Sequence, residues 1–331
     1  MVEYTIGPME DGKKVHRLLR QLLPGVPLSG IHKMIRTGRI KANGRKVKPD
    51  DVVAEGDVLR LFMAQEDYEA VRKPKGKFGG VSRDVEIVYE DSRCLAVNKP
   101  AGLLTHGDKT EQKDTLVNRV LARLYDLNEL IDSPFYPAPV HRLDRNTSGL
   151  VLFGKTPVVA RELSEAIANG GIHKWYIAIV KGQAPEQGTI RATLDRSATG
   201  NRTVLAKGGK SAETRFWTVA RSRSTCLVLI ELVTGRTHQI RAHFERIGCP
   251  LWGDVKYGGA APRSSTSSTS TRDAREELHQ WLHAMWLQLP EGKLLTAPLP
   301  GPFLENLRKL GYTQRQIEDI SRPPSTKGKG P

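Results

Sequence analysis

One aspartate of the sequence lies in a setting that favours reactivity. Asp144 stands between Arg142 and Arg145 in the stretch His141-Arg-Leu-Asp-Arg-Asn-Thr-Ser-Gly-Leu150, ahead of an expected turn and strand. Positive charge nearby favours the ionised form of a carboxyl group, so we expect Asp144 to be an anion at neutral pH. Such a carboxylate is suited to act as a nucleophile or to stabilise charge, rather than as a general acid. A structural ion pair in a turn is the alternative interpretation.

A second pattern resembles a nucleotide site only formally. Residues 149–156 match the phosphate-loop pattern G-x-x-x-x-G-K-[ST] letter for letter. A phosphate loop needs small residues so that successive backbone amides can wrap around phosphates. Residues 150–153 are instead large and apolar and predict a buried strand. We therefore expect no nucleotide cofactor, and a nucleotide hydrolase is a distant alternative.

The histidines do not form a convincing metal-binding pattern. His279 and His283 stand four residues apart, and His238 and His243 five apart. The first pair lacks the Glu of the zinc-binding pattern H-E-x-x-H, and the spacing of the second is poor for sharing one helical face. We predict ordinary structural histidines and no metal.

Four motifs, in order along the chain, resemble those of the RluA-type pseudouridine synthases, which isomerise uridine in RNA. Residues 141–150 resemble the catalytic motif of that family, and Asp91–Leu103 its first strand pair and turn. Lys174–Val180 resembles the strand that bears the active-site tyrosine. Val233–His243 resembles the motif that supplies an arginine to the catalytic aspartate. The resemblance covers roughly residues 84–311.

The resemblance implies a role for each site residue. Asp144 would attack the nucleotide, either at the ribose or at the pyrimidine ring, and the sequence leaves both possibilities open. Arg236 would pair with Asp144 and hold it ionised and oriented. Tyr176 would stack on the uracil and could take part in proton removal from the ring. Arg142 would fill the space left by the extruded base. The isomerisation needs no cofactor.

The positive charge of the chain is concentrated near its N-terminus. The chain has 51 Lys and Arg against 36 Asp and Glu, a formal net charge of +15. Residues 12–48 contain eleven basic residues and no acidic one, and the remaining 40 basic and 36 acidic residues nearly balance. Such a segment suits a polyanionic partner.

The same segment has the pattern of ordered structure. Apolar residues spaced three and four apart predict a helix over Val15–Leu23, and a second helix is expected over Gly30–Thr37. Asn43-Gly44 is a strong hairpin signal, and Gly56–Phe62 predicts a further strand. The arrangement resembles the alpha-L RNA-binding module of a ribosomal protein, which we place at residues 1–64. Its expected RNA contacts are Lys33, Arg36, Arg39, Lys41, Arg45 and Lys46.

The remaining chain divides into three parts. Residues 65–83 are polar and without periodicity and predict a flexible linker. Residues 84–311 mix strand and helix patterns without regular alternation, which predicts an α+β domain with a mixed, mostly antiparallel sheet. The resemblance implies that this is the catalytic domain, with the pseudouridine synthase fold of the family. Residues 312–331 are expected to form a C-terminal tail that is mobile at its end, and the Ser/Thr run 264–271 is also expected to be mobile.

Composition excludes several classes of protein. With 38% hydrophobic residues the chain can form a core, and its three cysteines are too few for a disulfide framework. No apolar run is long enough to cross a membrane, and the first residues lack a secretory leader. We expect a cytoplasmic protein without membrane contacts, and a monomer, since no heptad pattern is present.

The leading hypothesis is an isomerase that acts on uridines of large-subunit ribosomal RNA, because the resemblance covers both the basic module and the catalytic motifs. A paralogous family member that modifies other ribosomal uridines is one alternative. A non-catalytic RNA-binding factor for ribosome assembly is another. The joint presence of Asp144, Tyr176 and Arg236 argues against a retired active site.

Overall fold

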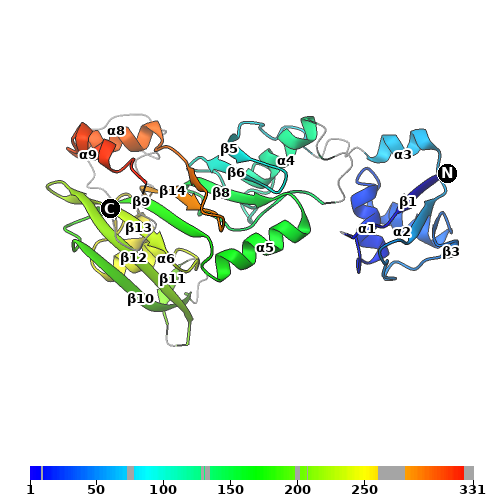
Figure 1. The fold of residues 1–331 in the computed structure, drawn as a ribbon, viewed down its shortest axis with the longest axis horizontal. Coiled ribbons are helices and arrows are strands. Elements are labelled where there is room, and N and C mark those ends of the chain that lie inside the picture. The colour runs from blue at the N-terminus through cyan, green and yellow to red at the C-terminus, as the bar shows by residue number, and fades with distance from the viewer. Residues whose placement is uncertain are drawn as a thin grey trace. The chain divides into compact units, whose positions relative to one another are not determined.

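The computed structural model describes residues 1–8, 10–72, 78–127, 130, 135–197, 202–206, 208–259 and 280–323 (Figure 1). The Ser/Thr run 264–271, His279 and residues 324–331 lie outside the described residues. The chain divides into two compact units. Unit 1 comprises Met1–Val85, Val117–Pro139 and Phe153–Arg161, and unit 2 comprises Glu86–Leu116, Val140–Leu152 and Glu162–Pro331.

The N-terminal part of unit 1 is a small layer of helices packed on a four-stranded antiparallel sheet, in the order β1-β4-β2-β3. The apolar stripe of the first helix is buried, as its spacing predicts. Asn43 and Gly44 both have positive φ, the conformation that a tight two-residue hairpin turn requires. The elements are β1 (Val2–Thr5), α1 (Val15–Leu22), α2 (Leu28–Arg36), β2 (Ile40–Ala42), β3 (Arg45–Lys46), β4 (Val58–Leu61) and α3 (Gln65–Arg72).

The prediction of a flexible linker over residues 65–83 is wrong for most of its length. Residues 65–72 form helix α3, whose Tyr68 is buried in the core of the N-terminal module. Farther along, Phe78 and Val81 are buried, and Arg83 forms an ion pair of 2.8 Å with Asp126 on α4 (Leu116–Asp126). A few buried side chains are enough to order such a polar segment. Residues 73–77 are not among the described residues.

The second sheet has the strand order β11-β10-β12-β13-β9-β14-β8-β6-β5. Neighbouring strands from β11 to β14 are antiparallel, whereas β14 runs parallel to β8, so the sheet is mixed and mostly antiparallel as expected. The strands are β5 (Glu86–Glu90), β6 (Cys94–Lys99), β7 (Ala138–Pro139), β8 (Ser148–Gly154), β9 (His173–Lys181), β10 (Gln187–Arg196), β11 (Thr203–Leu205), β12 (Lys210–Arg221), β13 (Thr225–Leu232), β14 (Leu282–Gln288) and β15 (Leu294–Thr296).

The other helices of the described residues are α4, α5 (Pro157–Ala168), α6 (Gln239–Arg246), the short 3-10 helix η1 (Val255–Tyr257), α8 (Gly301–Lys309) and α9 (Gln314–Asp319). Within the described part of the chain, no helix has both the length and the apolar character needed to cross a bilayer.

The segment that matches the phosphate-loop pattern is a buried strand. Every residue of β8 is buried. Gly149 has a φ of 111°, and a Cβ atom built on it would lie 2.2 Å from the carbonyl oxygen of Ala284 on β14. Its glycine therefore permits close packing between two strands and does not form a loop around a phosphate.

The expected C-terminal tail belongs to the core at its start. Tyr312, Ile317 and Ile320 are buried in the same cluster as Trp286 and Phe303. Helix α9 begins with a capping box formed by Thr313 and Gln316. The core of unit 2 therefore continues beyond the predicted boundary at residue 311, because the short helix α9 buries two isoleucines three residues apart.

Candidate active site

The loop that carries Asp144 is fixed on both sides of the carboxylate. His141 Nε2 accepts a hydrogen bond of 3.2 Å from the backbone N–H of Leu152 on β8. Farther along the loop, the hydroxyl of Thr105 donates to the carbonyl of Leu143 (3.0 Å) and accepts from its N–H (3.2 Å). The loop is thus held by side chains that satisfy its buried backbone groups, which restricts the positions available to Asp144.

A buried lysine holds the residue that follows Asp144. Lys99, at the end of β6, is fully buried. Its Nζ donates to the carbonyls of Pro100 (2.8 Å), Leu103 (2.7 Å) and Arg145 (3.0 Å). Burial lowers the pKa of Lys99 to about 7, while the charge of Asp144 acts in the opposite direction. Only the ammonium form has three N–H groups for the three carbonyls, so these contacts favour the protonated form.

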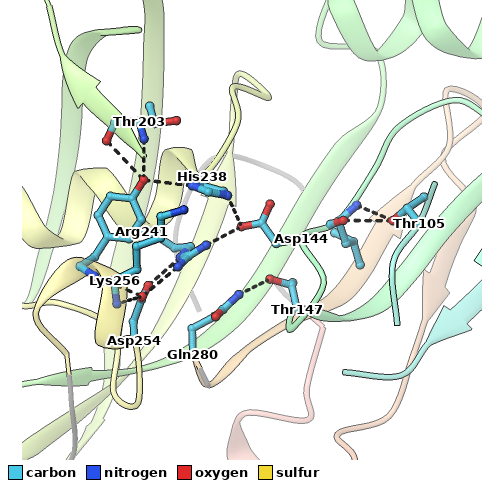
Figure 2. A network of polar contacts seen from close by, with 11 residues as sticks. Thr105, Asp144, Thr147, Thr203, His238, Arg241, Asp254, Lys256 and Gln280 are labelled. Atoms are coloured by element: carbon cyan, nitrogen blue, oxygen red, sulfur yellow. Dashed lines mark hydrogen bonds and ion pairs between the residues drawn. The ribbon is translucent and has the colours of Figure 1, made fainter. Parts of the chain in front are cut away.

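Arg241 on helix α6 is the arginine that contacts Asp144 (Figure 2). Its Nη1 lies 3.2 Å from Asp144 Oδ2. Its Nε and Nη2 bind the two carboxylate oxygens of Asp254 at 2.6 and 2.9 Å. The side chain of Arg241 is 9% exposed and that of Asp254 only 1% exposed. The bidentate contact with Asp254 fixes the guanidinium plane, and Nη1 is left to hold Asp144.

A second contact to the same oxygen comes from His238, which precedes α6. His238 Nε2 lies 3.8 Å from Asp144 Oδ2, and its Nδ1 lies 3.0 Å from the hydroxyl of Tyr257. Burial lowers the pKa of His238, and the nearby charge of Asp144 opposes that shift. Among the described residues, no hydrogen bond or ion pair reaches Asp144 Oδ1. One carboxylate oxygen is therefore held, and the other has no such contact within the described residues.

The expected pair between Arg236 and Asp144 is absent from the described residues. Arg236 is exposed, and its Nε donates to the carbonyl of Ser211 at 3.0 Å. Helix α6 begins only at Gln239, so Arg236 lies in the turn before it, whereas Arg241 lies on the buried face of the helix. The motif of residues 233–243 does supply an arginine to the aspartate, but that arginine is Arg241.

Asp144, Tyr176, Arg142 and Arg236 line one cavity of about 60 Å³, together with His238 and Arg241. We call it the aspartate pocket. Tyr176 lies on β9 and is buried; its burial and then the charge of Asp144 raise its pKa. The phenol therefore keeps its proton at neutral pH, and its ring lines the pocket. Arg142 is exposed at the pocket, as a residue that replaces an extruded base would have to be.

The expected RNA contacts of the N-terminal module lie on α2 and on the β2–β3 hairpin, except Arg39, which directly precedes β2. Five of them are exposed, and Lys41 is half-buried with its Nζ 5.2 Å from the centre of the Phe62 ring. Within the described residues none of the six forms a salt bridge. Lys41 stands directly opposite Lys46 across the hairpin, a like-charge pair that a polyanion would stabilise.

The histidines have structural contacts. His283 is buried, with Nδ1 2.8 Å from the hydroxyl of Ser148 and Nε2 3.0 Å from the carbonyl of Ala297. His243 contacts the hydroxyl of Thr214 at 2.9 Å. Over the described residues, no group of three or more His, Cys, Asp or Glu side chains is arranged to hold a metal ion.

The sequence patterns did not predict several residues of the site. Lys99, Thr105, His238, Arg241 and Asp254 all support Asp144 or its loop. A weak signal existed for Arg241, since it lies in the same motif as Arg236, five residues later. No signal for Asp254 was present, because it is distant in sequence from Asp144 and has no neighbouring motif residues.

Comparison with known proteins identifies the family of the chain. A family model described as RNA pseudouridylate synthase matches residues 93–246. Ribosomal large subunit pseudouridine synthase D of Pseudomonas aeruginosa is 33% identical over 300 residues, which cover 88% of this chain and 90% of that protein. Ribosomal large subunit pseudouridine synthase C of Salmonella typhi is 35% identical over 261 residues, 77% of this chain and 79% of that protein.

Solved structures show the same fold. Human RNA pseudouridylate synthase domain containing 4 matches with a TM-score of 0.54 at 24% identity, over 68% of this chain and 92% of that chain. Human RNA pseudouridylate synthase domain containing 1 matches with a TM-score of 0.52 at 23% identity, over 73% of this chain and 96% of that chain. The relatives above, which are similar over most of their length, confirm the expected family: the chain belongs to the RNA pseudouridine synthases, isomerases that convert uridine to pseudouridine in RNA.

Proposed function

We propose that the protein isomerises uridines of large-subunit ribosomal RNA, with Asp144 as the nucleophile. The observation that supports this role best is that only one of the two oxygens of the Asp144 carboxylate is contacted by described residues. Oδ2 is held by Arg241 and lies close to His238, while Oδ1 has no contact among the described residues and the group lines the aspartate pocket. A carboxylate that is oriented through one oxygen is prepared to attack through the other.

The reaction itself sets what the site must do. The bond between ribose C1′ and uracil N1 breaks, a bond between C1′ and ring C5 forms, and the hydrogen on C5 leaves as a proton while N1 gains one. No electron is transferred to or from an outside group. Asp144 would hold one fragment covalently while the base turns, and Tyr176 would stack on the ring.

The substrate is proposed from the relatives and from charge. The D and C enzymes named above carry large-subunit ribosomal specificity in their names. The six cations of the N-terminal module, which form no salt bridge within the described residues, suit a long polyanion, because each phosphate that they neutralise releases a counterion. Comparable similarity to both relatives leaves open which ribosomal uridines are modified.

Release of tritium from RNA labelled at uracil C5 tests the proposal, since that hydrogen leaves only when C5 bonds to the ribose. Large-subunit, small-subunit and transfer RNA transcripts are incubated with the protein in the presence of a chelator and without nucleotide. We expect release from the large-subunit transcript. Binding of that transcript without release would instead support an assembly factor, and release only from another RNA would contradict the proposed substrate.

The modified uridines are then found by mapping pseudouridines in large-subunit RNA from cells with and without the gene. Sites that disappear in the deletion strain identify the targets. A set of targets different from those of the D and C relatives would support the alternative of a paralogue that modifies other uridines.

A further inference from the structure

A second hollow adjoins the aspartate pocket. It has a volume of about 320 Å³ and is lined by residues of β10, β11 and the start of β12, and by the turn that precedes α6. We call it the hairpin hollow. Arg236 lines both it and the aspartate pocket, so the two cavities are neighbours that share one cation. No step proposed above uses the hairpin hollow.

The charge of the hairpin hollow favours an anion. Arg196, Lys210 and Arg236 line it, and all three are exposed. Within the described residues, neither the guanidinium of Arg196 nor the ammonium of Lys210 has a hydrogen-bond or ion-pair partner. Elsewhere on the same strands, arginines are paired: Arg191 on β10 binds Glu213 at 2.8 Å.

The hairpin hollow also contains groups that can recognise the rest of a nucleotide. Asp195 presents an exposed carboxylate and Thr237 an exposed hydroxyl. A carboxylate would repel a phosphate, but it accepts hydrogen bonds well from a ribose hydroxyl or from the N–H groups of a base edge. Separate cationic and acidic groups in one hollow therefore suit a nucleotide better than an inorganic anion.

The wall of the hairpin hollow is tied to the catalytic network. The backbone N–H of Thr203, on β11, donates to the hydroxyl of Tyr257 at 2.8 Å. That hydroxyl contacts His238 Nδ1, whose Nε2 lies close to Asp144 (Figure 2). Thr203 and Asp144 are thus connected through two side chains, which fixes the position of the hairpin hollow relative to the nucleophile.

The hairpin hollow is several times larger than the aspartate pocket. Ligand pockets begin at roughly 300 Å³. The hairpin hollow reaches that size, whereas the aspartate pocket, at about 60 Å³, is too small for a nucleoside without movement of its walls. The free protein therefore offers a nucleotide-sized site beside the target pocket and not in it.

We propose that the hairpin hollow binds a nucleotide that neighbours the target uridine in the RNA strand. Arg196 and Lys210 bind its phosphate, Asp195 and Thr237 contact its ribose or base, and Arg236 lies where the backbone passes from one cavity to the other. This inference rests on the proposed function, because it assumes that the target uridine enters the aspartate pocket. It assigns a binding role, and no chemical step, to the hairpin hollow.

The double variant Arg196→Gln/Lys210→Gln tests this proposal. Its matched control is Lys181→Gln/Arg223→Gln, which removes two exposed cations at the opposite end of the same sheet, next to the turn between β12 and β13. The assay is tritium release from the large-subunit transcript, under single-turnover conditions over a range of protein concentrations. We expect the half-saturating concentration to rise about tenfold in the hollow variant, with the saturating rate changed less than about twofold, while the control resembles wild type.

A second measurement locates the nucleotide directly. After the target uridine is mapped, RNA carrying 4-thiouridine one position to either side is irradiated in complex with the full-length protein. We expect cross-links to peptides that contain residues 194–196 or 208–210. Cross-links confined to other parts of the chain would overturn the assignment.

The outcomes are distinguishable. Wild-type protein that releases no tritium would overturn both this inference and the proposed function. If the wild-type protein releases tritium and Arg196→Gln/Lys210→Gln has the same half-saturating concentration as its control, this inference is overturned and the proposed function is not. A fall in the saturating rate with an unchanged half-saturating concentration would also contradict it, since the cations would then act in the chemistry.

Discussion

The cations of the N-terminal module and the arginine beside Asp144 have opposite surroundings. In the module, Arg45 and Lys46 are exposed on the hairpin, and neither has a salt-bridge partner among the described residues. In the candidate active site, Arg241 is almost fully buried. It is bound to Asp254 by two hydrogen bonds and contacts Asp144 through its third nitrogen. Unpaired, solvated cations can follow a flexible polyanion. A cation whose own orientation is fixed by a second carboxylate can instead hold a reactive group in one orientation.

We therefore expect affinity for RNA and chemistry to be separable in this chain. The N-terminal core is formed by residues 2–71, and the described residues that contact Asp144 or its loop belong to unit 2. Changes in the active site should alter the rate, and changes in the module should alter binding and its dependence on salt. Substitutions in each region test this division, and the largest effect is expected at Asp144, the proposed nucleophile.

Asp144→Asn keeps the shape of the side chain and removes its nucleophilic charge. We expect tritium release to fall by at least about 10³-fold, which corresponds to ~4 kcal/mol in the barrier, while RNA affinity stays within about twofold. Rates are measured at saturating RNA, and Asp319→Asn, an exposed change on α9, is the control. Turnover close to wild type would exclude Asp144 as the nucleophile.

Arg241→Lys keeps the charge but cannot bind Asp254 through two nitrogens and Asp144 through a third. We expect the saturating rate to fall by about 10²-fold, an effect of ~2.7 kcal/mol. Arg236→Lys is the matched control, since it makes the same replacement at an exposed arginine of the same pocket, and its saturating rate should change less than about threefold. A larger fall in the saturating rate for Arg236→Lys than for Arg241→Lys would instead support the pairing of Arg236 with Asp144 that the sequence suggested.

Acid should destabilise unit 2 through its buried histidines. Burial lowers the pKa of His243 and of His283 from 6.5 to about 4, and that of His141 to about 3. The unfolded chain therefore binds more protons than the folded chain below pH 6.5, and stability falls as the pH drops from 6.5 towards 4. Each histidine contributes on the order of 1 kcal/mol per pH unit in this window.

Urea unfolding followed by tryptophan fluorescence checks the acid prediction, because all five tryptophans lie in residues 175–286. The matched variant is His283→Gln, in which one acid-sensitive group is absent, and its stability should depend less steeply on pH between 6.5 and 4. Equal slopes for variant and wild type would show that His283 is not held neutral by the fold.

Arg45→Gln/Lys46→Gln should have the smallest effect. We expect affinity for the large-subunit transcript to fall a few-fold. The slope of log affinity against log salt should become shallower by about 0.7 for each phosphate of single-stranded RNA that the variant no longer neutralises. The control is Lys14→Gln/Arg60→Gln, whose side chains already pair with Asp50 and Glu3. A control with an equal change in slope would mean that the unpaired cations have no special role.

Sequence patterns predicted the local structure well wherever one residue or one period decides it. The stripe from Val15 to Leu22 and the Asn43-Gly44 turn are determined by neighbours within a few residues, and both are present. The large residues between Gly149 and Gly154 likewise excluded a phosphate loop. The mixed sheet was predictable as a class, although its strand order depends on pairings distant in sequence.

Patterns failed where a single contact decides the outcome. Gln65–Arg72 looked featureless because one buried residue, Tyr68, orders the helix. The choice between Arg236 and Arg241 depends on where α6 begins, and His238, with a φ of 50°, sets that start. Asp254 supports Arg241 from a separate turn, a relation that no local spacing reveals. These long-range contacts are also the ones that orient Asp144.

The division between binding and chemistry is tested most directly by removal of the module. The deletion should end at residue 72 rather than 83, so that Phe78, Val81 and Arg83 keep their contacts. Single-turnover tritium release at saturating large-subunit RNA is measured for the truncated and full-length proteins. We predict saturating rates that agree within about twofold, with a higher half-saturating concentration and a shallower salt dependence for the truncated protein. Loss of the saturating rate in a folded truncated protein would contradict the account, because the module would then take part in the chemistry.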